Sequence, residues 1–287
     1  MKKEKIKQND FKKEDLPKTR PALFFDILKN QTAIIVNTSL LTTLFSIPFL
    51  VISIFLYFIL SKAITEGQGF DKLFAIIFYG SLIMSPTIIL TLLGFSSSFY
   101  VAKKLAWGEG LLLKNHFFQS LKEEFKRSIF ISIILVLSFL LFLNGTTYLA
   151  IFYHKAPIWT GIGIAILIGQ FFLMMITTFY YFAYQSIYQN NFRETFKNSF
   201  LMATGRLHFS LLFFLLFPGL LIALILPHYI SAFVAIFLYA LFNFVGIFSW
   251  TLLTHQTFDL FINRTHYPDY VKKGLYIEKI NDKEEVG

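Results

Sequence analysis

The chain has 287 residues, of which 55% are hydrophobic, 37 are Phe and only 15% are charged. Soluble domains carry about 25% charged residues, so this composition excludes an ordinary water-soluble protein and indicates an integral membrane protein. The net charge of +9 would suggest a nucleic-acid partner in a soluble protein. Here Lys and Arg flank apolar runs, which predicts anionic lipid headgroups as the partner and no nucleic acid.

Residues 1–32 form a polar, basic segment, and the first apolar run begins only after it. That run is long and has no cleavage site of small residues, so we interpret it as a retained membrane span rather than a signal peptide. The chain contains no Cys, which excludes disulfides and thiolate chemistry.

Six apolar segments follow one another along the chain, and each is near or above the roughly 20 residues that a membrane-spanning helix needs. They are residues 33–60, 73–102, 129–153, 158–188, 209–226 and 229–254. The sequence therefore predicts an all-α polytopic membrane protein with six transmembrane helices. Its parts are a cytoplasmic N-terminal segment (1–32), a membrane domain (33–254) and a cytoplasmic C-terminal tail (255–287).

Lys and Arg residues are distributed unequally between the segments that separate these spans. The two termini and the second and fourth connections carry 23 of them, and the other three connections carry 3. By the positive-inside rule, both termini and the two longer loops are predicted to be cytoplasmic. This orientation requires an even number of spans, which agrees with six.

The loop between the second and third spans has the pattern of an amphipathic helix over residues 117–127. Its apolar residues share one face and its cations lie on another, which predicts a helix along the inner leaflet. Glu123 and Arg127 are four residues apart and can pair on the polar face. The apolar residues are Phe117, Phe118, Leu121 and Phe125, and the cations are Lys122, Lys126 and Arg127.

The loop between the fourth and fifth spans has a related pattern over residues 192–200. Phe192 and Phe196 share a face, while Arg193 and Lys197 point elsewhere. We interpret the two helices as contact surfaces, either for a membrane-protein partner or for lipid alone. A homo-oligomer is a further alternative that the sequence leaves open.

Polar residues within the spans are few, and the centres of the six spans contain no ionisable side chain. Asn37, Gln170 and Asn243 are candidates to line an intramembrane polar space, although hydrogen bonds between helices are their commoner use. Gly161, Ala165 and Gly169 repeat every four residues in the fourth span, which predicts close packing against another helix.

A serine-rich motif, with Ser96 and Ser97, resembles part of an intramembrane hydrolase site if His255 approaches as a base. The final Gly of such a motif is absent. The six His residues lack metal-binding spacing, so neither a metal nor a cofactor is predicted.

Three stretches resemble, in the same order, the YesL-like (DUF624) family of bacterial membrane proteins. They read FFDILKNQTAIIVNTSLLTTLFSIPFL, then FYVAKKLAWGEG with NHFFQSLKEEFKRSIF, then FKNSFLMATGRLHFSLLFFLL. The resemblance implies a multi-pass protein of the bacterial inner membrane, encoded near carbohydrate importers. It implies no catalytic residues.

The leading hypothesis is a non-catalytic accessory or partner subunit of a membrane assembly, linked to carbohydrate uptake by the family resemblance. The alternative is a transporter permease that forms the substrate pathway itself. An intramembrane hydrolase is the third hypothesis.

Overall fold

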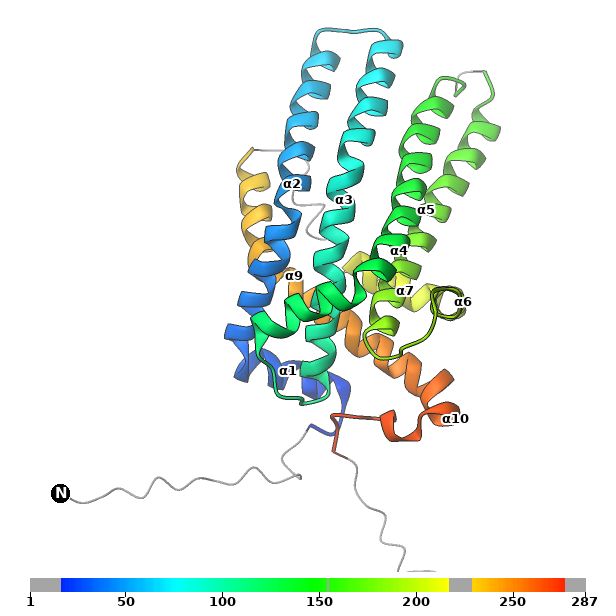
Figure 1. Cartoon of the computed structure of the whole chain (residues 1–287). Coiled ribbons are helices and arrows are strands. Elements are labelled where there is room, and N and C mark those ends of the chain that lie inside the picture. Colours follow the sequence, from blue (N-terminus) through cyan, green and yellow to red (C-terminus); the bar gives the residue numbers. More distant parts are fainter. Residues whose placement is uncertain (1–16, 154, 217–228, 277–287) are drawn as a thin grey trace, which may run out of the picture.

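The structure is a computed structural model that describes residues 17–153, 155–216 and 229–276, and every regular element in these ranges is helical (Figure 1). Five helical stretches are long and apolar enough to cross a membrane: α2 (Thr32–Thr65), α3 (Phe70–Ala106), α4 (Leu113–Ala150), α5 (Pro157–Gln185) and the stretch Ile236–His266, which includes most of α9 (Tyr229–Phe258). The predicted all-α class, with several apolar helices long enough to cross a membrane, is thereby confirmed. Of the predicted span 209–226, α7 (Leu207–Leu216) is described, and residues 217–226 lie outside the described residues.

The long helices are arranged as two hairpins and one further helix. Figure 1 shows α2 beside α3 and α4 beside α5, while α9 packs against α2 and α3. The shorter helices α1 (Arg20–Asn30), α6 (Phe192–Gly205) and α10 (Arg264–His266) gather at one end of the bundle. Both ends of the described chain lie there too, since the amide of Tyr276 donates to the carbonyl of Pro17.

Helix starts and ends follow from local sequence. Thr19 caps α1 by accepting from the amide of Ala22, and the Asn191 side chain caps α6 by accepting from the amide of Glu194. Pro157 stands at the start of α5, where its missing N–H costs nothing. Gly108 has a φ of +66°, a conformation that ends α3 and that residues with a Cβ rarely adopt.

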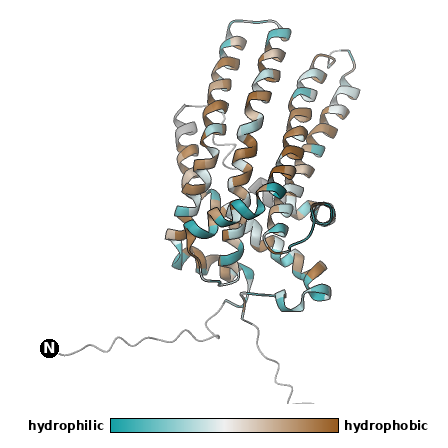
Figure 2. Ribbon diagram, viewed as in Figure 1, coloured by the Kyte–Doolittle hydropathy of each residue, from teal (hydrophilic) through white to brown (hydrophobic). Residues whose placement is uncertain are grey.

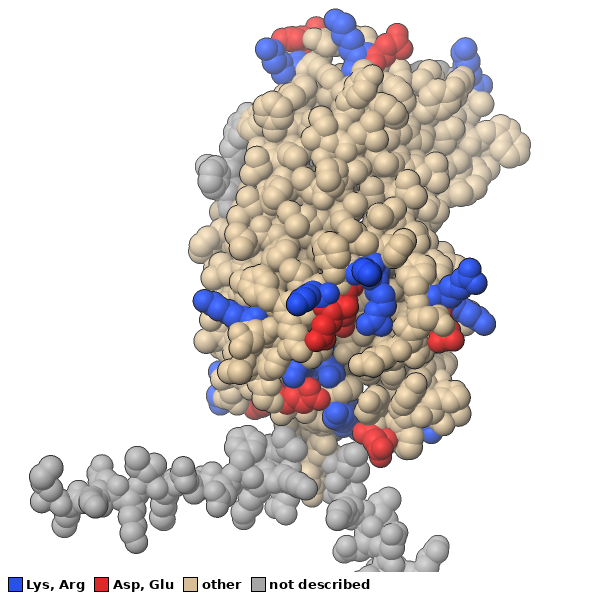
Figure 3. All heavy atoms as spheres, viewed as in Figure 1, with Lys and Arg blue, Asp and Glu red and all other residues tan. Residues whose placement is uncertain are grey.

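Charged and apolar residues occupy different zones along the long axis of the molecule. Figure 2 shows mostly apolar turns along the long helices and polar turns gathered around the short helices. In the space-filling view, charged side chains lie at the tips of the hairpins and in a second zone near the other end, with a broad uncharged surface between (Figure 3). That surface includes exposed Leu44, Phe55 and Leu137. Such a band matches the hydrocarbon layer of a bilayer.

Helix α4 differs from the predicted arrangement. Residues 117–127 do not form a separate connecting helix, because they are the first turns of a continuous helix that also contains the third predicted span. No Pro or Gly occurs between Leu113 and Asn144 to break it. In Figure 1 these turns lie across the bundle before α4 rises beside α5. The second predicted connecting helix is separate, since α6 ends at Gly205 and α7 starts at Leu207.

Close approach of helices depends on different small residues from those predicted. Gly161, Ala165 and Gly169 are exposed, and a Cβ built at either glycine would meet no atom within 4 Å. Among the described residues that prediction is wrong, because the row packs against no other helix. A tight contact is instead found at Gly94 of α3, where a Cβ would lie 2.7 Å from the Cβ of Phe45 in α2.

We predict that Gly94→Ala destabilises the protein by about 1–3 kcal/mol, because the new methyl group forces α2 and α3 apart. Thermal unfolding of the protein in detergent measures this change. The matched control is Gly169→Ala, which adds the same methyl group to an exposed helix position; because Ala favours a helix more than Gly does, its unfolding temperature should be unchanged or slightly higher. Equal behaviour of the two variants would contradict the α2–α3 contact.

Candidate functional site

A buried polar cluster joins α3, α4 and α5 near the charged end of the bundle. The side-chain amide of Gln185 donates to Ser96 Oγ at 2.7 Å and to Ser128 Oγ at 2.8 Å, and the two serine oxygens are 2.7 Å apart. All three side chains are at most 3% exposed. Because each comes from a different helix, the cluster ties together the last turn of α5 and the middle of α3 and α4.

Glu124 extends this cluster and was not predicted as a site residue. It is only 7% exposed, Ser96 hydrogen-bonds to its carboxyl group, and its Oε2 has no hydrogen-bond partner in the described residues. Ser120, Glu124 and Ser128 are spaced by four residues, so they share one face of α4. This regular spacing is the sequence signal that identifies the buried face.

The first turns of α4 present three faces rather than two. The inward face carries Glu124 and the fully buried Phe117, whose ring packs on Phe45. Phe117 therefore cannot contact lipid or a partner as predicted. Phe118 and Phe125 are exposed on the adjoining face, with Leu121 partly buried between them.

The two lysines of this segment lie on the third face, and Arg127 lies on the opposite side of the inward face. Lys122 and Lys126 are exposed, as predicted. Arg127 does not pair with Glu123; its guanidinium donates to the carbonyl of Asn190 at 3.3 Å, in the connection between α5 and α6. Glu123 instead accepts from the side chain of Gln119. Arg127 is thus a structural link between α4 and that connection.

Helix α6 repeats the three-face arrangement. Thr195 and Ser199 are fully buried against the bundle, and neither hydroxyl has a hydrogen-bond partner in the described residues. The rings of Phe192 and Phe196 stack and are half-buried beside that face. Arg193 and Lys197 are exposed, as the pattern predicts.

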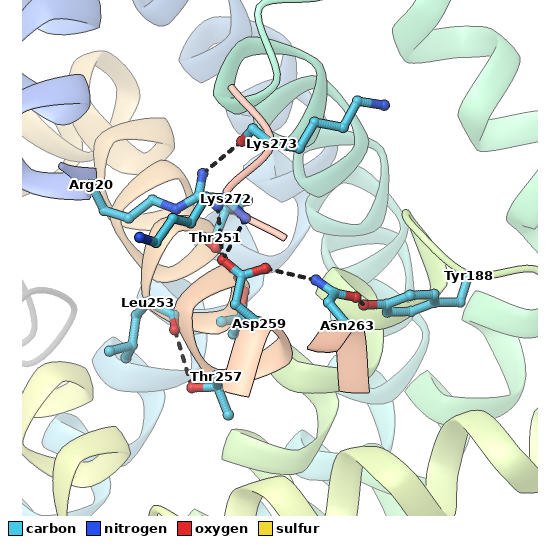
Figure 4. A network of polar contacts seen from close by, with 10 residues as sticks. Arg20, Tyr188, Thr251, Leu253, Thr257, Asp259, Asn263, Lys272 and Lys273 are labelled. Carbon is cyan, nitrogen blue, oxygen red and sulfur yellow. Dashed lines mark hydrogen bonds and ion pairs between the residues drawn. The ribbon is translucent and has the colours of Figure 1, made fainter. Parts of the chain in front are cut away.

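A second polar network fixes the chain after α9, where a π-helix, η2 (Asp259–Asn263), follows directly (Figure 4). The Asp259 carboxylate accepts from Arg20 at 3.2 Å, from the amide of Lys272 at 3.2 Å and from the Asn263 side chain at 2.8 Å. The Tyr188 hydroxyl donates to the side-chain carbonyl oxygen of Asn263. Asp259 therefore joins α1, η2 and the C-terminal segment.

Glu109 fixes the same segment to the end of α3. Its carboxylate lies 3.4 Å from the ammonium groups of Lys103 and Lys273, and the Lys273 ammonium stands 3.8 Å above the ring of Trp107. Partial burial alone would raise the pKa of Glu109, but the charges of Lys103 and Lys273 hold it below its usual range.

The remaining predicted site residues are placed apart from one another. Asn37 is exposed on α2, so it lines no interior space. Gln170 donates to Ser138 Oγ at 2.8 Å, and Asn243 donates to Thr43 Oγ1 at 2.8 Å and to the carbonyl of Ser39. The last two therefore form bonds between helices, which is the commoner of the two uses considered for them.

The Ser–His arrangement that a hydrolase needs is not formed in the described residues. Ser96 bonds to Ser128 and Gln185, and Ser97 donates to the carbonyl of Leu93 in its own helix. His255 is buried, and neither of its ring nitrogens has a hydrogen-bond partner in the described part of the chain. No base is thus positioned on either serine.

A surface cleft opens between α6 and the η2–α10 segment, with a volume of about 480 Å³. At its floor the Tyr184 hydroxyl accepts from the side-chain amides of Asn190 and Asn198, both at 3.0 Å. Apolar side chains, among them Leu201 and Phe261, form its walls.

Comparison of the chain with protein-family models, with curated proteins and with solved structures found no match.

We predict that Asp259→Asn destabilises the protein by about 3 kcal/mol, because it leaves the guanidinium of Arg20 largely buried without its anion. Burial lowers the pKa of Arg20, against the charge and hydrogen bond of Asp259, but arginine keeps its proton at neutral pH. The unfolding temperature measures the loss. Asp269→Asn, at an exposed position, is the control and should behave as the wild type.

We also predict that the C-terminal segment loosens in acid. The pKa of Glu109 is lower in the folded protein than in the unfolded chain, so its contribution is complete above the unfolded value and is lost as the pH falls through the folded one. The protection of residues 270–276 against hydrogen exchange, relative to the intrinsic exchange rate at each pH, should then fall. This fall should be absent in Glu109→Gln, which is loosened at every pH, and should persist in Glu66→Gln, at the far tip of the α2–α3 hairpin.

Proposed function

We propose that the chain is a six-span inner-membrane protein of YesL-like type that acts as a non-catalytic accessory or partner subunit of a membrane assembly. Both termini and the helices α1, α6 and α10 lie on its cytoplasmic side. The uncharged surface between two charged zones supports the membrane placement (Figure 3). The excess of Lys and Arg in the segments at this end supports the orientation.

The observation that carries the partner role is the three-face arrangement of α4 and α6. Each helix uses its hydroxyl-bearing face to pack on the bundle. Phe118 and Phe125 of α4, the half-buried Phe rings of α6 and the exposed cations of both helices remain at the surface. Phe118 and Phe125 are positioned to enter the headgroup region, while Lys122 and Lys126 face the cytoplasm. A charged, rigidly held surface of this kind suits an acidic surface of a partner protein.

The rigidity of that end also favours a docking role. Arg127 fixes α4 to the start of the α5–α6 connection, and Asp259 fixes η2 to α1. The cleft beside α6 is lined by side chains from both regions. A preformed surface loses little conformational freedom on association, which favours binding.

The transporter permease remains the second candidate, because one observation favours it. Buried ionisable groups in membrane proteins mark ion and substrate pathways more often than packing, and Glu124 is such a group. The polar side chains of Gln170 and Asn243, by contrast, form helix-packing bonds.

The partner role is tested by affinity purification of the full-length protein in mild detergent from its own cells. We expect a defined membrane-protein partner to copurify, and the double variant Lys122→Glu and Lys126→Glu to reduce its recovery at least tenfold. The control is Lys62→Glu with Lys72→Glu, which reverses two exposed charges at the tip of the α2–α3 hairpin, at the opposite end of the bundle. Recovery of the protein alone, together with substrate flux in reconstituted vesicles, would favour the permease instead.

The orientation has a separate test, which the absence of native Cys makes direct. Single Cys residues at Gly67 or Lys155 should react with a membrane-impermeant maleimide on intact cells. Single Cys residues at Lys126 or Lys197 should react only after the membrane is permeabilised. The opposite pattern would contradict the proposed orientation.

A further inference from the structure

The hydrogen bonds around Glu124 leave its carboxyl group incompletely satisfied. Gln185 uses both N–H groups of its amide on Ser96 and Ser128. One serine hydroxyl is consumed in the bond between the two serines, so a single O–H remains for the carboxyl group of Glu124. Hydrogen bonds are thus donated by Gln185 to both serines and by one serine hydroxyl to Glu124. Oε2 of Glu124 accepts no hydrogen bond in the described residues.

No cation in the described residues lies within 4 Å of the Glu124 carboxylate. Arg127, on the same helix, directs its guanidinium to the carbonyl of Asn190. Lys103 of α3 pairs with Glu109. The charges of Arg127 and Lys103 act on Glu124 from beyond 4 Å. The other titratable groups that face it are Glu123 on its own helix, Tyr100 of α3 and Tyr181 of α5, and none of these supplies positive charge. A buried carboxylate without a counter-charge is costly.

Further oxygen atoms without partners lie on the same helix faces. Gln185 Oε1, the hydroxyl of Ser120 and the hydroxyl of Tyr181 are all buried, and none has a hydrogen-bond partner in the described residues. Ser120 is one turn before Glu124 on α4, and Tyr181 is one turn before Gln185 on α5. Carboxylate, amide and hydroxyl oxygens are the groups that hard cations prefer, and they also accept protons in hydrogen bonds.

We propose that the carboxyl group of Glu124, held in place by Ser96, Ser128 and Gln185, binds one monovalent cation, a proton or an alkali-metal ion. The cation supplies the positive charge that the buried carboxylate lacks. Exposed Lys122 and Lys126 are on the same turns of α4 as Glu124, so the site is about one helix diameter from water. This inference does not depend on the partner role proposed above.

The test is the unfolding temperature of the full-length protein in lipid nanodiscs, measured between about pH 5 and pH 9 in choline chloride, NaCl or KCl at constant ionic strength. In choline, we expect the unfolding temperature of the wild type to fall by about 4 °C as the pH rises, because the site loses its proton. Recovery on addition of NaCl or KCl at high pH identifies an alkali-metal ion as the ligand. Absence of recovery identifies the proton.

The variant Glu124→Gln replaces the carboxyl group with a neutral group of the same shape, so its unfolding temperature should respond to neither pH nor salt. Glu123→Gln, at the exposed neighbouring position, should respond as the wild type does. The proposal is overturned if Glu124→Gln keeps the wild-type response or if the wild type responds to neither variable.

A second measurement covers the case in which Glu124→Gln does not fold. Infrared difference spectra of the wild type, between low and high pH in choline, should contain the C=O band of a buried protonated carboxyl group. Addition of NaCl at intermediate pH should remove that band if the two cations compete. A wild-type spectrum without such a band at any pH, together with no effect of salt on the unfolding temperature, would overturn the proposal.

Discussion

Polar side chains between apolar helices must find their hydrogen-bond partners on other helices, because neither lipid nor water reaches them. Thr42 of α2 bonds to Ser98 of α3, Asn144 of α4 bonds to Ser81 of α3, and Gln185 of α5 bonds to Ser96 and Ser128. Many other hydroxyls donate to carbonyls of their own helix, as Thr177 does. Specific polar bonds therefore determine which helix faces meet, in an environment where apolar contact alone distinguishes them weakly.

The same requirement extends to the charged end of the molecule and connects the fold to the proposed role. Asp259 holds Arg20 and the C-terminal segment, while Glu109 holds Lys103 and Lys273. These contacts keep α1, η2 and the end of α3 in fixed positions beneath the long helices. The exposed cations of α4 and α6 are consequently presented on a rigid support.

The sequence predicts the existence and approximate limits of the long helices well, because about 20 consecutive apolar residues have few alternatives to a membrane span. It predicts the inward faces poorly. In a protein surrounded by lipid the exterior is as apolar as the interior, so the Phe residues of α4 do not reveal which way they point. Phe117 is buried and Phe118 is exposed, and the inward face is identified by Ser120 and Glu124 instead.

The other features that the sequence did not reveal depend on which segments meet in the folded chain. Arg20 and Asp259 are 239 positions apart, and no local pattern connects them. The Gly161 row has the spacing of a packing motif, yet it faces outward, since spacing shows which residues share a face and not what that face touches. Gly94 begins a row of the same spacing, with Ser98 and Ala102, and this second row is the one buried against α2, so spacing alone does not distinguish the two rows.

The central claim is that α4 begins with a polar face against the bundle, a Phe face in lipid and a cationic face in water. Nitroxide labels at successive positions from 114 to 128, in vesicles, test it through their accessibility to oxygen and to a water-soluble nickel complex. We expect oxygen accessibility to be highest at 118, 121 and 125, nickel accessibility to be highest at 119, 122 and 126, and both to be lowest at 117, 120 and 124. Lowest accessibility to both reagents at 118, 121 and 125 would contradict the claim.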